Sequence, residues 1–202
     1  MRGAALAICL AATILGRSAR ADGVADAWAG TAWGESPQAL QRALGSRGFA
    51  LPQPIDFGDS YAPLVVRQLP VGGFPLIVYY QIDKASHGLK RIQLELPRHR
   101  VNAAAFRGVY DALAGALGIP DTACGAAPGA ATGYQGTAEY AWRRDGLVIR
   151  AIFRDTSLEA LGGCVSPACG LTAQLLVRVS PPALDGGTCA KLPTRGELRA
   201  RP

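Results

Sequence analysis

Ser86 and His87 form the one place in the sequence where a hydroxyl and an imidazole adjoin, the two groups that nucleophilic hydrolases combine. Neighbours on a turn rarely point at each other, so we interpret this pair as part of a solvated loop between two strands. Asp83 and Glu95 could pair as carboxylates, although no spacing in the sequence brings them together. His99 lies in a basic turn, where an exposed position is expected. With no Gly-x-Ser-x-Gly, His-Glu-x-x-His or phosphate-binding loop, the sequence identifies no catalytic residue.

Four cysteines lie downstream of the N-terminal segment: Cys124, Cys164, Cys169 and Cys189. An even number in an exported chain predicts disulfides, and proximity favours Cys164 with Cys169 and Cys124 with Cys189. Zinc ligation is the alternative, but only two of the cysteines are close and both histidines lie in the other half of the chain. The four-residue spacing does not match a catalytic redox pair. The sequence therefore predicts no metal site and no cofactor.

A binding surface is the other chemistry that the sequence suggests. Alternation within the predicted strands places a mixture of aromatic, aliphatic and arginine side chains on one face of a sheet, the composition enriched where proteins bind partners. The candidate binding residues are Tyr79, Arg91, Arg150, Ile152, Arg154 and Arg178. Two other interpretations stay open: an ordinary solvated sheet face, or a face covered by the N-terminal segment that carries Trp28 and Trp33.

An internal repeat predicts how these residues are positioned. The pattern Ala-Leu-x-x-Ala-Leu-Gly at residues 39–45 returns at residues 112–118, 73 residues later. The same shift places Gly72-Gly73 on Asp145-Gly146, and both pairs favour two-residue hairpin turns. We therefore predict two copies of one unit, at about residues 33–97 and 101–181. The last strand of the second copy aligns with that of the first only when ten extra residues are allowed. These residues lie within an insertion at 155–171.

Each predicted copy is a helix followed by three strands. The first helix begins with Ser36 as the N-cap and ends at Gly45, and the second covers Val101–Leu117. Short connections between consecutive strands predict an antiparallel meander. The fold class is therefore α+β: a tandem repeat forming one antiparallel sheet with both helices on one face. Strands are expected at 64–69, 76–82, 89–96, 134–142, 147–154 and 172–179, an irregular connection at 46–63 and a loop at 122–133.

The face that packs on the helices is predicted from the same alternation, since side chains two residues apart point to one side of a strand. On that side every position is apolar. These residues are Leu76, Val78, Tyr80, Ile82, Ile92, Leu94, Leu96, Ile149, Ala151, Phe153, Leu175, Val177 and Val179.

The first 21 residues have the features of a secretory signal peptide: a basic start, an apolar run from Ala4 to Leu15, and Ala19-Arg20-Ala21 as a cleavage site. The run is too short to span a bilayer. Cleavage would leave 18 basic and 15 acidic residues, a net charge of +3 instead of +6. So small an excess predicts no nucleic-acid partner. We expect one α+β domain at 22–181, a flexible tail at 182–202 and no membrane-spanning segment in the cleaved chain.

A short pattern also carries a family resemblance. The pattern Gly-x-Ser-x-x-x-Leu, at Gly34, Ser36 and Leu40, marks the start of a short helix that ends at Leu44-Gly45. A meander of three strands follows this helix. This arrangement resembles the SmpA-type outer-membrane assembly domain, and two such units in tandem resemble the β-lactamase-inhibitor-protein fold. The likeness covers most of residues 33–180, but this chain lacks a lipoprotein cysteine and carries the cysteine insertion. The resemblance implies protein–protein binding through the sheet face and transfers no catalytic residue.

Together these features predict a non-enzymatic binding module of the bacterial envelope, periplasmic or secreted. Its partner would be a protein or another envelope component, bound at the exposed sheet face. The alternative is a periplasmic hydrolase that uses His87 or an unrecognised carboxylate such as Asp83. A broad open sheet favours binding, whereas a deep polar cleft would favour the enzyme.

Overall fold

A computed structural model describes residues 23–125, 137–155 and 173–185 of the chain. The predicted signal peptide at 1–21, most of the insertion and the last 17 residues of the predicted tail lie outside the described residues. So do Cys164, Cys169 and Cys189. The expectations for these segments stay predictions.

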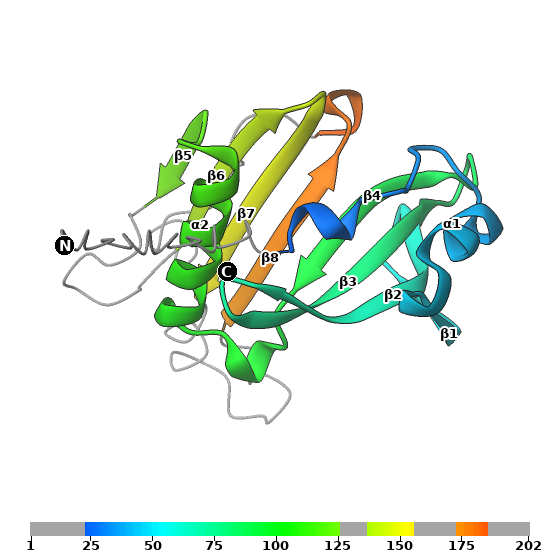
Figure 1. Cartoon of the computed structure of the whole chain (residues 1–202), viewed down its shortest axis with the longest axis horizontal. Helices are drawn as coiled ribbons and strands as arrows, with labels where there is room; N and C mark the ends of the chain where they lie inside the picture. The colour runs from blue at the N-terminus through cyan, green and yellow to red at the C-terminus, as the bar shows by residue number, and fades with distance from the viewer. Residues whose placement is uncertain (1–22, 126–136, 156–172, 186–202) are drawn as a thin grey trace, which may run out of the picture.

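One antiparallel sheet of eight strands forms the centre of the fold, in the order β1-β2-β3-β4-β8-β7-β6-β5 (Figure 1). Strands β4 and β8 pair at the middle and so join the two halves of the chain. The strands are β1 (Phe49–Asp56), β2 (Ser60–Val71), β3 (Phe74–Asp83), β4 (Leu89–Glu95), β5 (Thr122–Gly125), β6 (Thr137–Arg144), β7 (Leu147–Asp155) and β8 (Ala173–Ser180).

Two α-helices begin at side-chain caps. In α1 (Pro37–Leu44), the Ser36 hydroxyl accepts a hydrogen bond from the Ala39 amide, as the sequence predicts, and Gly45 ends the helix with a φ of 54°. In α2 (Ala103–Leu117), the Asn102 side chain caps the first turn and Gly118 follows the last. Short 3-10 helices complete the fold: η1 (Ala25–Ala27), η2 (Gly45–Arg47), η3 (Arg98–Arg100) and η5 (Pro182–Leu184).

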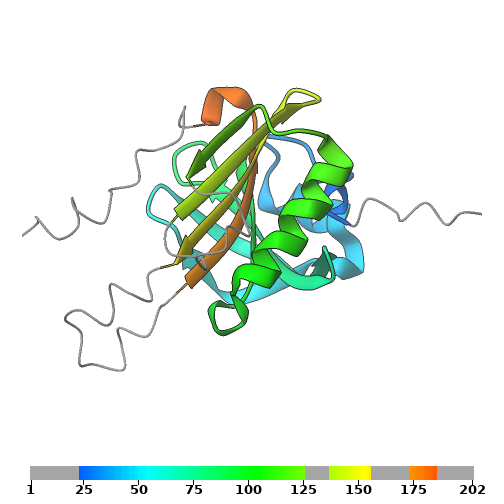
Figure 2. The same cartoon turned by 90° about the vertical axis from the view of Figure 1, so that its left-hand side faces the viewer.

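Both helices cover the same face of the sheet, and the predicted core face is confirmed. Leu40 and Leu44 of α1 belong to one buried cluster with Phe106 and Leu113 of α2 and with all the predicted inward residues of the strands. Figure 2 shows α2 lying along one side of the twisted sheet. We call the opposite side the outer face.

The predicted number of strands is wrong, because the sheet contains eight strands and not six. Residues 49–56, predicted to be irregular, form the edge strand β1, and residues 122–125, predicted to be a loop, form the other edge strand β5. Pro52 and Pro54 caused the first error. Proline has no amide hydrogen to donate, but an edge strand tolerates it because one side of the strand has no partner.

The two predicted hairpin turns are confirmed. Gly72-Gly73 connects β2 to β3 and Asp145-Gly146 connects β6 to β7, with positive φ at all four residues. The first hairpin also touches the second helix. A Cβ atom added at Gly72 would collide with the carbonyl oxygen of Gly108 on α2. The absence of a side chain at Gly72 therefore lets the β2–β3 hairpin reach α2.

Within the described residues, no helix has the length and apolar character needed to cross a membrane.

Candidate functional site

The strand register brings three of the predicted binding residues into one row of the outer face. Tyr79 on β3 is opposite Gln93 on β4, which is opposite Arg178 on β8, which is opposite Arg150 on β7. The other three lie in neighbouring rows. Arg91 pairs with Gln81, Ile152 with Leu176, and Arg154 with Gln174 in the backbone ladder.

The far end of this row is buried. Arg150 is 8% exposed and Ile152 is 3% exposed, so the expectation that both lie on an open surface is wrong. Arg150 donates two hydrogen bonds to the carboxylate of Asp185, at 2.5 and 2.7 Å, and one to Glu139 at 2.5 Å. Asp185 follows η5, so the chain returns across the end of β7 after leaving the sheet. The hydrogen bonds that Arg150 donates to Asp185, and to a smaller extent the one it donates to Glu139, raise the pKa of Arg150.

The centre of the outer face is a connected set of polar side chains. The Ser60 hydroxyl donates a hydrogen bond to Gln81. The Gln81 side-chain amide donates one to Gln93, and the Gln93 amide donates one to Glu95. Arg178 and Arg91 each add a hydrogen bond to a glutamine oxygen of this set. Gln81 and Gln93 are buried. Because these groups satisfy one another, the centre of the face offers few free polar atoms to a ligand.

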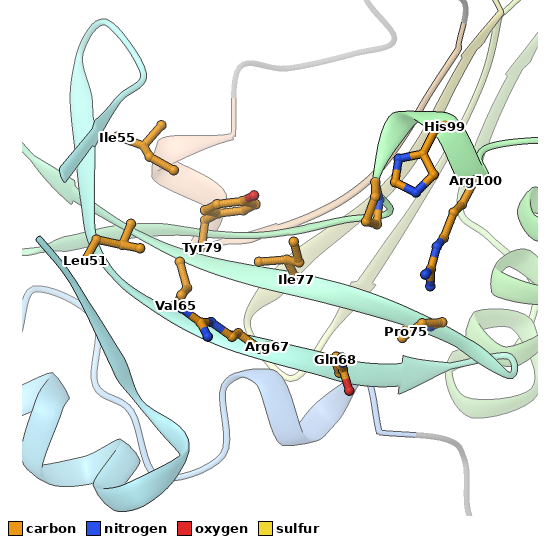
Figure 3. A pocket seen from close by; sticks show the side chains of 11 residues that line it. Leu51, Ile55, Val65, Arg67, Gln68, Pro75, Ile77, Tyr79, His99 and Arg100 are labelled. Atoms are coloured by element: carbon orange, nitrogen blue, oxygen red, sulfur yellow. The ribbon is translucent and has the colours of Figure 1, made fainter. Parts of the chain in front are cut away.

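A groove opens on the other end of the outer face, over β2 and β3, with a volume of about 330 Å³. Figure 3 shows Leu51 and Ile55 at one end, Val65, Ile77 and Tyr79 in the middle, and His99 and Arg100 at the opposite end. We call this the outer-face groove. Its lining residues are Leu51, Ile55, Val65, Arg67, Gln68, Pro75, Ile77, Tyr79, Pro97, His99 and Arg100.

Two irregularities in strand pairing shape the groove. The register between β1 and β2 breaks between Ala50 and Ile55, where the prolines cannot contribute amide hydrogens to a ladder. The register between β2 and β3 shifts between Val66 and Leu69, and within this bulge Gln68 has a φ of 58°. A bulge changes the direction of the side chains near it, and a positive φ in a residue other than glycine is a strained conformation that is common at functional sites.

Apolar groups are unusually exposed beside the groove. Phe49 and Ile55 on β1 are 41% and 40% exposed, and both are large side chains that would normally be buried. The guanidinium of Arg67 lies 3.6 Å above the centre of the Phe49 ring, a cation–π contact. This contact holds a positive charge next to the apolar lining.

The two charged side chains of the groove lining, Arg67 and Arg100, are both positive. Arg67, His99 and Arg100 have exposed side chains and form no salt bridge with any described carboxylate. Glu95 is opposite the lining residue Ile77 in the strand ladder, and it is contacted by Arg98 at 3.9 Å and by Gln93. Burial raises the pKa of Glu95, and burial followed by the Glu95 charge raises the pKa of Tyr79.

The residues considered for catalysis do not form a site together. Asp83 pairs with Lys90 at 2.8 Å and accepts hydrogen bonds from the Ser86 amide and hydroxyl, and these contacts, Lys90 first, lower the pKa of Asp83. His87 is exposed, and among the described residues its side chain makes no hydrogen bond with Ser86 or with a carboxylate. A carboxylate with a lowered pKa is a weak base at neutral pH.

Of the cysteines in the predicted disulfides, the structure describes only Cys124, on β5. The predicted pairings stay predictions, and non-reducing peptide mapping would test them. In the described ranges, no group of three or more His, Cys, Asp or Glu side chains is arranged to hold a metal ion.

Sequence reasoning missed most of the groove. The sequence predicts Tyr79 as a binding residue and His99 as an exposed turn residue, but it gives no role to Leu51, Ile55, Arg67 or Gln68. The Pro-x-Pro sequence at residues 52–54 could have indicated an edge strand with a break. No local signal identifies the bulge at Gln68.

Comparison of the chain with known protein families, curated proteins and solved structures found no match.

Proposed function

We propose that this protein is a non-enzymatic binding module of the bacterial envelope that holds its partner or ligand in the outer-face groove. One observation carries the proposal. An apolar groove of about 330 Å³, bordered by two arginines and a histidine, lies on the sheet face that neither helix covers. Its volume falls at the low end of the range typical of ligand sites, about 300–1,000 Å³.

The composition of the lining supports binding over catalysis. Tyr79, Ile77 and Ile55 provide apolar contact area, and Arg67 and Arg100 provide charge at its border. Aromatic and arginine side chains dominate the energetics of binding surfaces. The alternative hydrolase has no comparable support in the described residues, because Ser86 and His87 share no hydrogen bond and Asp83 is engaged by Lys90.

Arg150, Ile152 and Arg178 have a different role in this proposal. Burial and the Arg150 hydrogen bonds indicate that this end of the face stabilises the fold. Tyr79 is the residue of the predicted binding set that also lines the groove. Arg91 and Arg154 stay candidates for the border of a larger partner.

The tandem repeat and the export of the protein are part of the same proposal. The order of elements, a helix and then four strands in each half, supports two copies of one unit. The expected signal peptide supports a periplasmic or secreted location. The resemblance to SmpA-type modules, and to the β-lactamase-inhibitor-protein fold, would fit a sheet face used for binding.

Site-specific photo-crosslinking tests this function. A photoreactive amino acid would replace Gln68 in the groove of the full chain, and in a matched control it would replace exposed Arg107 on α2. After irradiation in the producing cells, mass spectrometry would identify the crosslinked species. We expect a product specific to position 68 that is lost when Ile77→Asp is added. Identical products at the two positions would contradict the proposal.

A further inference from the structure

Building on this proposed binding function, we infer that the occupant of the outer-face groove is a single-chain anionic amphiphile, a free long-chain fatty acid. Its acyl chain would lie over Leu51, Ile55, Val65 and Ile77, and its carboxylate would lie near Arg100. The groove is asymmetric in this sense: Leu51 and Ile55 lie at one end, His99 and Arg100 lie at the other, and Arg67 lies between them beside Val65 (Figure 3).

The dimensions fit an extended chain. Tyr79 and Pro75, both in the lining, are four residues apart on β3, which corresponds to about 13 Å along an extended strand. The groove continues beyond Tyr79 to Ile55 on β1 and beyond Pro75 to Arg100 on η3. The lining therefore extends along β3 from β1 to η3, an arrangement that suits a linear acyl chain.

The engagement of the backbone of β2 and β3 in the sheet favours an acyl chain over a peptide. Strands β2 and β3 are interior strands, and each pairs on both sides. Pro75 and Pro97 contribute no amide hydrogens to the surface. A peptide brings one amide and one carbonyl per residue, and each needs a partner when water is removed. An acyl chain has no such groups and loses no hydrogen bonds on entering the groove.

Charge complementarity favours an acidic head group. Arg67 and Arg100 are positive, and in the described part of the chain neither is paired with a carboxylate. Glu95, which is opposite the lining residue Ile77, is held by Arg98 and Gln93. The end of the groove near η3 therefore carries the positive charge of Arg100, which attracts a carboxylate, and Arg67 adds a second positive charge farther along the groove.

The binding experiment uses the full chain and sodium oleate kept below the concentration at which it forms micelles, with isothermal titration calorimetry as the measurement. Methyl oleate has the same chain with a neutral head. The variants are Ile77→Asp, which places a charge under the acyl chain, and the double variant Arg67→Gln with Arg100→Gln. Arg107→Gln on α2 is the matched control, because it removes an exposed arginine from the opposite side of the sheet. Ile77→Ala replaces Ile77→Asp if the latter does not fold.

We expect saturable oleate binding, with methyl oleate at least about tenfold weaker. The double arginine variant should weaken oleate binding about tenfold and Ile77→Asp should abolish it, whereas Arg107→Gln should have no effect. Equal binding of oleate and methyl oleate, or no loss in the groove variants, would overturn the inference. So would binding only to phosphatidylglycerol vesicles, which would indicate a membrane surface as the occupant. A protein crosslinked at position 68 without oleate binding would overturn the fatty-acid inference and leave the binding function intact.

Discussion

The guanidinium of Arg150 on β7 holds the carboxylate of Asp185 through two hydrogen bonds, 2.5 and 2.7 Å long, between residues 35 positions apart. Both side chains are at least nine-tenths buried. A paired, planar contact of this kind is among the stronger charge-assisted interactions. It fixes the segment after η5 against the outer face.

Asp185→Asn should therefore destabilise the protein. The variant keeps the size of the side chain but removes the charge, and Arg150 retains Glu139, so we expect a loss of about 2 kcal/mol in the free energy of unfolding. Urea denaturation would measure the change. Asp111→Asn, at an exposed position on α2, is the control and should change stability by less than about 0.5 kcal/mol. Equal stabilities of the two variants would show that the Asp185 contact contributes nothing.

Local periodicity explains why the core could be predicted. Leu76, Val78 and Tyr80 point to one side of β3 because of strand geometry alone, and all three are buried as expected. The caps and hairpin turns were predictable for the same reason, since Ser36 and Gly72-Gly73 each act through their immediate neighbours.

The outer face could not be predicted in this way. Alternation correctly placed Arg150 and Ile152 on that face, but it carries no information on what covers them, and Asp185 reaches Arg150 from 35 residues away. The groove depends on two register breaks, at Leu51–Pro54 and at Arg67–Gln68. Register is determined by the packing of whole strands, so no short stretch of sequence indicates these breaks.

Gly72 and Gly73 offer a matched test of the contact between the β2–β3 hairpin and α2. Both have positive φ, so alanine at either position should cost about 1 kcal/mol through backbone strain. Only at Gly72 would the new methyl group collide with Gly108, whereas nothing lies within 4 Å of a Cβ atom at Gly73. Gly72→Ala should therefore lower the free energy of unfolding by at least about 2 kcal/mol more than Gly73→Ala. The same loss in both variants would show that hairpin and helix are not in tight contact.

Tyr80 links β3 to the N-terminal turn. Its hydroxyl donates a 2.8 Å hydrogen bond to the carbonyl oxygen of Ala27, in the buried core. Tyr80→Phe should cost about 1 to 2 kcal/mol, because the Ala27 carbonyl would lose its buried donor. Tyr61→Phe is the control, since Tyr61 is only partly buried and its hydroxyl forms no hydrogen bond within the described residues. Thermal denaturation would measure the loss of stability in each variant. Equal losses in Tyr80→Phe and Tyr61→Phe would contradict the role of the hydrogen bond to Ala27.

The ionisation of Tyr80 gives this prediction a pH dependence. Burial raises the pKa of Tyr80 from 10.0 to about 12. A raised folded-state pKa means that the neutral phenol stabilises the fold, fully below pH 10 and decreasingly as the pH rises toward 12. Wild-type stability should therefore fall between pH 10 and 12 more steeply than that of Tyr80→Phe. Ultraviolet absorbance would follow tyrosinate formation, and parallel profiles for the two proteins would contradict the assignment.

Glu95 connects the groove to the stability of the sheet. Burial raises its pKa above 4.5, although Arg98, Gln93 and Arg178 act in the opposite direction. The charged form is therefore the less stable one in the folded protein. The destabilisation of the folded protein by this charge is absent below pH 4.5, where Glu95 is protonated in both the folded and the unfolded state. It develops as the pH rises through the folded-state pKa.

Glu95→Gln removes the charge and should raise the melting temperature at pH 7, with the gain disappearing toward pH 4. Asp111→Asn, as an exposed carboxylate control, should show no such gain. A constant difference between Glu95→Gln and wild type at both pH values would mean that side-chain shape, and not the buried charge of Glu95, determines its effect.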